Sequence, residues 1–465
     1  MTRFAMFAAL YVVALYLEPA ERWTDPRVTA LLLALGVLLL VIGLTRKTLA
    51  LFLVVATAHP LLMWFPDVPN HVNVEIYVSL LLLFAIGYTL WRREEYPTDD
   101  ACFELVRPVL QVSMILIYAL AGFSKLNADF INPQVSCAGS MLAGLATVAT
   151  RRTFGVPRVL FGAAAVGVSI VAVLSARPPA RAIPVWARAA LFALILFPVV
   201  LAVWLAPAIP AGVVAFMILG TAGMVILWEL VGGLLLTVPR FQAPLLAFSW
   251  TMHAMLSLIG FVHFGALAIA MLFTFVPAPY LDLATTRVRL PIVGQSVPRS
   301  HVYLASNLLT GVVSGFGSRI VAALMFNLGV FFLLCPILSA VVARAPRPVW
   351  PGVSLWSRRT PGWLYVFPVF LLLHGLTSYV GLRTAGNFTM FSNLRTEGAR
   401  SNHLLLGSNP LKVWGYQEDV IRFLAIDDSL AAIDGKYLAC MAIICRWWSS
   451  GSGFTSGRNR AGRSR

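Results

Sequence analysis

Long apolar runs recur along this chain and restrict what it can fold into. A helix needs ~20 apolar residues to cross the hydrocarbon core of a bilayer, and runs near that length recur from residue 4 to residue 382. The mean hydropathy is +0.83 and only 12% of residues are charged, whereas soluble domains carry ~25%. We therefore predict an all-α, polytopic integral membrane helical bundle with roughly nine to twelve spans.

The first apolar run, Phe4–Leu17, follows Arg3 and has the general form of a secretory signal peptide. Glu18-Pro19-Ala20-Glu21-Arg22 comes directly after it and offers no small-residue cleavage site. We therefore interpret this run as a retained first span. The next four predicted spans are Val28–Leu44, Thr48–Phe65, Val72–Trp91 and Leu105–Phe123.

Basic residues in the short loops predict the orientation. Thr45-Arg46-Lys47 and Arg92-Arg93 are basic, whereas Pro66–Asn70 contains no lysine or arginine. Cytoplasmic loops carry an excess of lysine and arginine, so we expect a cytoplasmic N-terminus. On this basis the fifth span ends on the outer side of the cell membrane, with Lys125 just beyond it.

The later runs are less uniform. Ile131–Thr150 is weak in large apolar residues, and we expect it to lie in the outer interface. Ala243–Val276 is too long for one upright helix, and Gly260 near its middle predicts two helices or one kinked helix. The remaining predicted spans are Phe154–Ser175, Val185–Ala206, Val213–Val238, Ile320–Val342 and Trp363–Leu382.

The composition changes after Arg383. We assign residues 1–383 to a multi-span membrane domain and residues 384–428 to a small polar extramembrane module. Residues 429–465 form a weakly apolar segment followed by a tail rich in Gly, Ser and Arg, which cannot bury a core and is expected to be disordered.

The charge and the cysteines give little indication of other partners. The formal net charge is +16, but the arginines lie in short loops, where they act as topology signals and not as a nucleic-acid-binding face. The lipid bilayer is the expected partner. The five cysteines are an odd number with no metal-ligand spacing, so we predict no metal site and no disulfide.

Two residues at the outer face are candidates for chemistry. Lys125 ends an apolar run and is followed by Asn127 and Asp129. It is either an interfacial anchor with its amine in water or a catalytic or binding group at a membrane mouth. His71 follows Asn70 at the start of a span on the same side, and is either an ordinary first-turn residue or a second functional group.

Two ionisable residues lie inside apolar runs, Glu229 in MVILWELVGG and His253 in FSWTMHAML. A charged group within the membrane is costly unless it has a partner or a water-filled cavity. We expect Glu229 and His253 to lie within hydrogen-bond reach of each other, directly or through a water molecule. Such a pair would either fix helix packing or form part of a site.

Three segments resemble a known membrane family. Tyr118–Asp129, YALAGFSKLNAD, resembles the Y-x-x-A-G-x-x-K-L-x-x-D stretch of the horizontally transferred transmembrane (HTTM) family, whose best-known relative is the vitamin K-dependent gamma-carboxylase. Asn70-His71 resembles the Asn-His pair that opens a helix in that family. Trp228-Glu229-Leu230, followed by Trp250-Thr251-Met252-His253, is similar to its Glu-Leu and Phe-His pair.

The resemblance implies a quinone-linked membrane enzyme from a bacterial setting. By resemblance, Lys125 would be the base that deprotonates a vitamin K-type quinol, and His71 would support it. The carboxylase has a large lumenal region that grips its protein substrate, where this chain has only the short polar segment 384–428. The resemblance therefore supports quinone chemistry more than carboxylation of a protein glutamate. The alternative is a non-enzymatic membrane protein or a transporter of unknown substrate.

Overall fold

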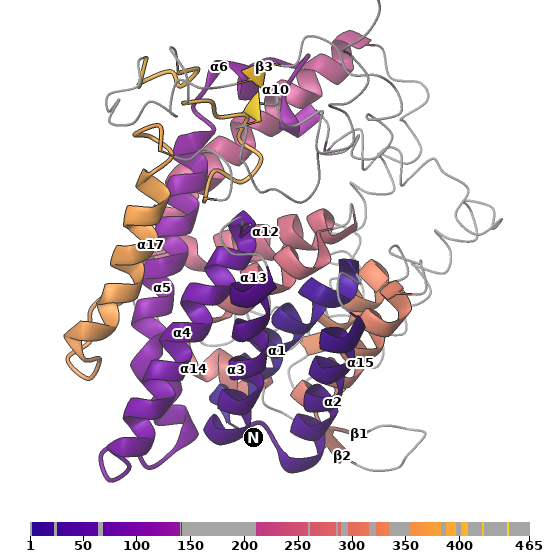
Figure 1. Cartoon of the computed structure of the whole chain (residues 1–465), viewed down its shortest axis with the longest axis vertical. Coiled ribbons are helices and arrows are strands. Elements are labelled where there is room, and N and C mark those ends of the chain that lie inside the picture. Colours follow the sequence, from indigo (N-terminus) through magenta and orange to yellow (C-terminus); the bar gives the residue numbers. More distant parts are fainter. Residues whose placement is uncertain are drawn as a thin grey trace, which may run out of the picture.

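The computed structural model describes residues 2–22, 26–63, 68–139, 141, 211–258, 261–284, 287–289, 296–315, 322–330, 332–333, 353–382, 387–396, 401–407, 421–422 and 444–445. The described chain is mostly helical, with two small two-stranded sheets (Figure 1). Its helices are α1 (Arg3–Arg22), α2 (Pro26–Ile42), α3 (Arg46–Met63), α4 (Asn70–Trp91), α5 (Asp99–Ser124), α6 (Ala128–Ile131), α10 (Ala211–Leu227), the π-helical η2 (Trp228–Gly232), α11 (Gly233–Leu235), α12 (Pro239–Leu258), α13 (Val262–Phe273), α14 (Ala278–Ala284), α15 (Arg299–Gly315), the 3₁₀-helical η3 (Gly362–Tyr365) and α17 (Val366–Leu376). The strands are β1 (Arg287–Arg289) paired with β2 (Ser296–Pro298), and β3 (Ile421–Arg422) paired with β4 (Ile444–Cys445), both antiparallel.

Four helices in the described part of the chain are long and apolar enough to cross a membrane. They are Arg46–Met63, Asn70–Trp91, Asp99–Ser124 and Ala215–Leu235. Large apolar side chains also point outward from the bundle: Val41 is 79% exposed, Leu62 80% and Phe216 75%. Because a water-soluble surface would not present such residues over whole helix faces, these faces suit lipid.

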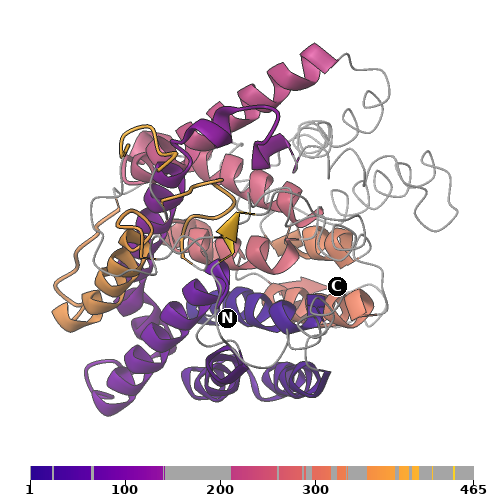
Figure 2. The same cartoon turned by 45° about the horizontal axis from the view of Figure 1, so that its top comes forward.

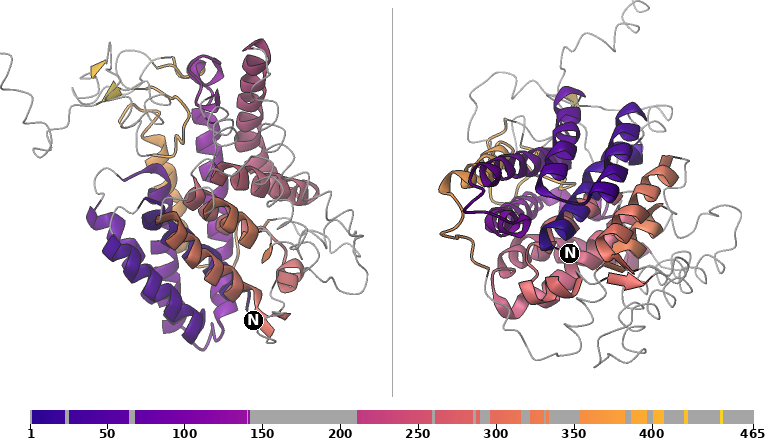
Figure 3. Two further views of the ribbon diagram at one scale, coloured as in Figure 1. Left: turned by 90° about the vertical axis from the view of Figure 1, so that its right-hand side faces the viewer. Right: turned by 90° about the horizontal axis from the view of Figure 1, so that it is seen from below.

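Helix α1 lies at the centre of the bundle. Residues Phe4–Leu17 are all buried, and α1 packs against α13, α15, α2, α3 and α5. Seen from below, the N-terminus lies near the middle of the helices (Figure 3). The Tyr11 hydroxyl donates to the Glu75 carbonyl of α4 over 2.9 Å. The first apolar run therefore forms the middle of the core.

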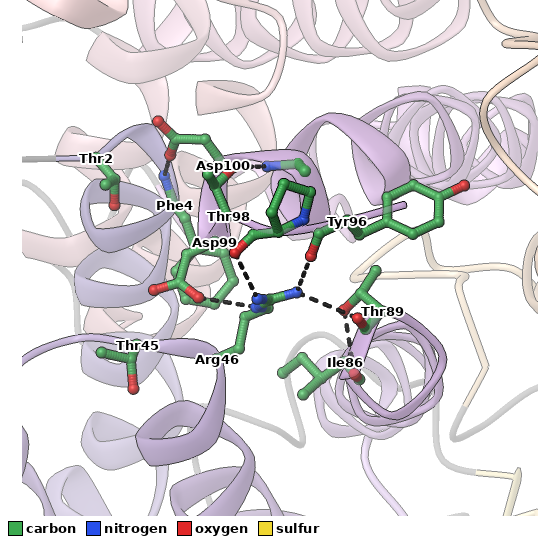
Figure 4. A network of polar contacts seen from close by, with 12 residues as sticks. Thr2, Phe4, Thr45, Arg46, Ile86, Thr89, Tyr96, Thr98, Asp99 and Asp100 are labelled. Carbon is green, nitrogen blue, oxygen red and sulfur yellow. Dashed lines mark hydrogen bonds and ion pairs between the residues drawn. The ribbon is translucent and has the colours of Figure 1, made fainter. Parts of the chain in front are cut away.

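Arg46 joins three segments at one end of the bundle (Figure 4). Its side chain is buried and donates to the Asp99 carboxylate over 2.8 Å and to the Tyr96 carbonyl over 3.0 Å. The neighbouring Asp100 carboxylate accepts from the backbone N–H of Phe4 over 2.9 Å. Arg46 therefore has a structural role, because it ties the start of α3 to the turn between α4 and α5 and to the start of α5.

The two ends of α5 carry different groups of residues. Arg3 forms ion pairs with Asp282 of α14 and with Glu104 near the start of α5, so the N-terminus and the segment after Pro277 lie at the same end. Lys125 caps the other end, about 39 Å away for a helix of 26 residues at 1.5 Å rise. The N-terminus and Lys125 therefore lie at opposite ends of α5, as the basic loops predict.

Two helix boundaries bear on the sequence predictions. The long run Ala243–Val276 is divided between α12 and α13, as Gly260 predicted. The run expected to span as far as Leu382 is wrong at its end, because α17 stops at Leu376 and turns follow. The predicted spans Phe154–Ser175 and Val185–Ala206, the rest of Ile131–Thr150 beyond its first residues, and most of 408–465 lie outside the described residues.

Candidate functional site

Lys125 is buried at the C-terminal end of α5. Its side chain is 5% exposed, and Nζ lies 2.7 Å from Oε2 of Glu229, whose side chain is 11% exposed. Nζ also donates to the Ala121 carbonyl over 3.4 Å and lies 5.8 Å from the centre of the Phe130 ring. A lysine that anchors a helix at the interface keeps its amine in water. Lys125 instead holds a buried ion pair.

Glycine in the YALAGFSK motif explains how Glu229 reaches this lysine. A Cβ at Gly122 would lie 2.6 Å from the backbone nitrogen of Leu230 and 2.9 Å from the carbonyl carbon of Glu229. On the other side of the contact, a Cβ at Gly233 would lie 2.8 Å from Cβ of Tyr118. Small residues let two membrane helices approach backbone to backbone. Gly122 and Gly233 therefore bring α5 against η2.

Glu229 lies on a π-helical turn, Trp228–Gly232, between α10 and α11. Such a turn shifts the register of the side chains that follow and often occurs at functional sites. The sequence contains no clear signal for it. The offset and the close approach at Gly122 together place the Glu229 carboxylate beside the Lys125 amine.

In the described structure Glu229 and His253 have direct partners other than each other, whereas the predicted contact through a water molecule stays a prediction. Glu229 pairs with Lys125, and Nε2 of His253 lies 2.9 Å from the Tyr118 hydroxyl. The physical expectation that each buried ionisable group needs a partner holds for both residues. Both partners come from α5, which supplies Lys125 to Glu229 on η2 and Tyr118 to His253 on α12, and the sequence does not indicate this.

His71 belongs to a separate pair. Its Nε2 lies 2.7 Å from Nε2 of His263 on α13, with the ring centres 4.3 Å apart. One nitrogen of such a contact must carry the proton that the other accepts. His263 is 2% exposed and was not singled out in the sequence. The two predicted catalytic residues, Lys125 and His71, therefore have different partners.

Helix α13 connects the two histidine pairs. Phe264, which follows His263, packs its ring edge-on against the His253 ring, with the ring centres 5.3 Å apart. A Cβ at Gly265 would lie 2.9 Å from the His253 carbonyl oxygen. The His71–His263 and Tyr118–His253 pairs thus both contact α13, at the neighbouring residues His263, Phe264 and Gly265.

A C-terminal segment, residues 387–396 and 401–407, covers the end of α5; we call it the strap. Figure 2 shows this end of the bundle turned toward the viewer. The backbone N–H of Leu404 donates to the Leu126 carbonyl over 2.8 Å, and that of Ala128 to the Asn402 carbonyl over 3.1 Å. Arg395 forms an ion pair with Asp129. The strap is therefore fixed to the residues that directly follow Lys125.

The polar residues of the lysine motif hold this strap. The Asn127 side chain donates to the Ser124 carbonyl over 2.8 Å and to the Ser392 carbonyl, and its oxygen accepts from the N–H of Phe130 over 2.9 Å. Asp129 accepts from Asn402 over 3.0 Å. The K-L-N-A-D sequence thus combines a buried amine with a docking site for the strap, which the sequence did not indicate.

His403 of the strap is held as a neutral ring. Its Nε2 lies 2.9 Å from the Phe123 carbonyl, and its Nδ1 accepts from the backbone N–H groups of Leu405 and Leu406, each over 3.2 Å. Burial lowers the pKa of His403 from its ordinary value of 6.5, partly opposed by the bond to Phe123. A proton on Nδ1 would point at the N–H groups of Leu405 and Leu406, so these contacts favour the neutral ring that carries its proton on Nε2.

Comparisons with known proteins give no further identification. No family model matches the chain, and neither the curated proteins nor the solved structures include a significant match. In the part of the chain that the structure describes, no three His, Cys, Asp or Glu side chains are grouped as metal ligands. The assignment of function therefore depends on the geometry and on the resemblance of the lysine motif.

Proposed function

We propose that this chain is a multi-pass membrane enzyme of the HTTM type in which Lys125 removes a proton from a hydroxyl of a vitamin K-type quinol. The proposal includes a polytopic bundle of roughly nine to twelve spans with a short polar C-terminal appendage, and a bacterial cell membrane with the N-terminus in the cytoplasm.

The observation that carries the proposal is the buried pair of Lys125 and Glu229, 2.7 Å apart. Taking two charges out of water costs free energy that their attraction seldom exceeds. Such a pair therefore adds little net stability, which favours a functional role for it. A lysine amine can exchange a proton with a neighbouring carboxyl group, which an arginine cannot do.

The proton transfer is balanced within the pair. Within the ion pair the Lys125 ammonium first passes one proton to the Glu229 carboxylate, which leaves a neutral amine and a carboxylic acid. The O–H bond of the quinol then breaks, its electron pair stays on the oxygen, and an N–H bond forms at Nζ of Lys125. The Glu229 carboxyl group, 2.7 Å from Nζ, supports the ammonium that results. The strap and the packed α5–η2 contact shield the site from water, which strengthens these interactions.

The His71–His263 pair is the second group that the proposal uses. Its 2.7 Å contact joins two imidazole rings, and a neutral imidazole donates through one nitrogen and accepts through the other. His263 is buried whereas His71 is partly exposed. By resemblance to the Asn-His pair of the family, His71 would support Lys125 in acting on the same substrate.

The test uses the purified full chain in lipid nanodiscs. The oxygen-dependent consumption of 2-methyl-1,4-naphthoquinol is measured and corrected for autoxidation in empty nanodiscs. Loss of a general base lowers rates by ~10²–10⁴-fold, so we expect Lys125→Arg to lose at least ~100-fold. Lys47→Arg is the matched control, because Lys47 is exposed and lies at the start of α3. A wild-type rate in Lys125→Arg, or a wild-type protein no faster than empty nanodiscs, would contradict the proposal.

A further inference from the structure

A second buried polar cluster lies next to the lysine pair. At its centre the Tyr118 hydroxyl is 2.9 Å from Nε2 of His253. Trp228 packs against Tyr118 with the ring centres 5.4 Å apart, and Ser249 lies beside the same hydroxyl. We call these four residues the tyrosine cluster. All four are more than nine-tenths buried.

Several polar atoms of the tyrosine cluster have no hydrogen-bond partner among the described residues. Nε1 of Trp228 and Oγ of Ser249 face the Tyr118 hydroxyl but form no hydrogen bond of good geometry with it, and Nδ1 of His253 has no partner in the described part of the chain either. Nε1 of Trp250, next to Ser249 in the chain, is in the same state. Burying a donor or acceptor without a partner costs free energy, so native proteins rarely leave such atoms together. Their concentration beside one hydroxyl points to a ligand group.

The chemistry of these atoms selects the kind of group. An indole N–H can only donate, and a serine or tyrosine hydroxyl can donate as well as accept. Such a set is complementary to an acceptor oxygen, and it favours an oxygen on which negative charge develops.

We propose that the tyrosine cluster binds one oxygen of the ligand, as the carbonyl of a quinone or the oxyanion of a deprotonated quinol. This inference rests on the proposed function and extends it. It assigns Tyr118, Ser249 and Trp228 to ligand binding and leaves proton transfer to Lys125.

The position of the cluster fits a ligand with two oxygens. Tyr118 and Lys125 are seven residues apart on α5, about two helical turns or ~10 Å along the axis, and so share one face of the helix. Trp228 of the cluster directly precedes Glu229 of the lysine pair in η2. A 1,4-quinol likewise carries its two oxygens at opposite ends of an apolar ring.

The chain offers a matched control. Tyr77 of α4 and His374 of α17 form another tyrosine–histidine contact, with the Tyr77 hydroxyl 3.3 Å from Nδ1 of His374. Replacing Tyr77 or Tyr118 by phenylalanine removes the same hydroxyl from a helix of the same bundle. Of these two tyrosines, only Tyr118 lies beside the buried polar atoms of Trp228 and Ser249 named above.

The experiment measures binding separately from turnover. The full chain in nanodiscs is titrated with 2-methyl-1,4-naphthoquinone, and binding is followed by quenching of tryptophan fluorescence. 2-Methylnaphthalene, which has the same rings without the oxygens, competes as the ligand control. We expect Tyr118→Phe and Ser249→Ala each to raise the Kd for the quinone about tenfold, the effect of one lost hydrogen bond. The affinity for the hydrocarbon should stay unchanged, and Tyr77→Phe should bind the quinone like wild type.

The outcomes separate this inference from the proposed function. If Tyr118→Phe and Ser249→Ala, both folded by circular dichroism, bind the quinone as tightly as wild type, the tyrosine cluster is not the oxygen site, even if turnover still requires Lys125. If Tyr118→Phe fails to fold, Ser249→Ala, which only removes one oxygen, decides alone. If wild type binds the quinone no better than the hydrocarbon, both proposals fail. Lys125→Arg that keeps the quinone affinity and loses turnover supports both.

Discussion

The ion pair of Lys125 and Glu229 allows a quantitative prediction. Exposed pairs contribute about 0–1 kcal/mol, but these side chains are 5% and 11% exposed, so the buried case applies. Glu229→Leu leaves an ammonium whose other contacts are the 3.4 Å bond to the Ala121 carbonyl and the Phe130 ring at 5.8 Å. Neither contact replaces a carboxylate. We expect Glu229→Leu to lower the free energy of unfolding by about 3–5 kcal/mol.

Two further variants separate the cause from general damage. Glu229→Gln keeps an acceptor for the ammonium, so its loss should be clearly smaller than that of Glu229→Leu. The double variant Lys125→Met with Glu229→Leu removes both charges, and replacing a buried pair by apolar residues is often neutral. We therefore expect the double variant to recover most of the stability that the single variant loses.

The measurement is reversible unfolding in mixed micelles, followed by circular dichroism as the fraction of denaturing detergent rises. Wild type, Lys125→Met, Glu229→Leu and the double variant form a double-mutant cycle, which isolates the pairwise interaction. Equal tolerance of Glu229→Leu and Glu229→Gln would refute the reasoning. So would a double variant whose loss equals the sum of the two single losses, because the side chains would then be energetically independent.

Three other predictions concern a helix contact, the pH dependence of the strap and the orientation of the chain. Gly122→Ala should lower the free energy of unfolding by about 1–3 kcal/mol and reduce quinol turnover, because its Cβ would lie 2.6 Å from a backbone nitrogen of η2. Wild-type stability and turnover in this variant would show that the two helices separate freely. For His403, burial lowers the pKa below 6.5, so the unfolded chain binds the proton more readily; the stability of the strap is complete above about pH 6.5 and falls below it. Hydrogen exchange of the strap amides should accelerate between pH 7.5 and pH 5.5 in wild type, and a pH-independent rate would count against this. In intact cells, an impermeant thiol reagent should label Ala128→Cys and spare Glu94→Cys, both exposed positions at opposite ends of α5; the reverse labelling pattern would invert the proposed orientation.

The position of Lys125 and the break near Gly260 could be read from the sequence because both depend on local properties. Hydropathy summed over a window indicates a span, and a glycine within an overlong run indicates an interruption. The same reasoning predicted that Glu229 and His253 need partners. It also predicted that the N-terminus and Lys125 lie at opposite ends of the bundle, since basic loops alternate with the order of spans.

The partners themselves were decided only by the tertiary structure. Glu229 meets Lys125 because Gly122 allows a backbone contact and the π turn in η2 changes the register. His253 meets Tyr118 instead. Hydropathy is summed along the chain and contains no term for the distance between two helices, so it states that a buried charge needs a partner without selecting which one. That choice depends on ångström-scale packing between segments more than one hundred residues apart in the sequence, and here the close approach of α5 to η2 makes it.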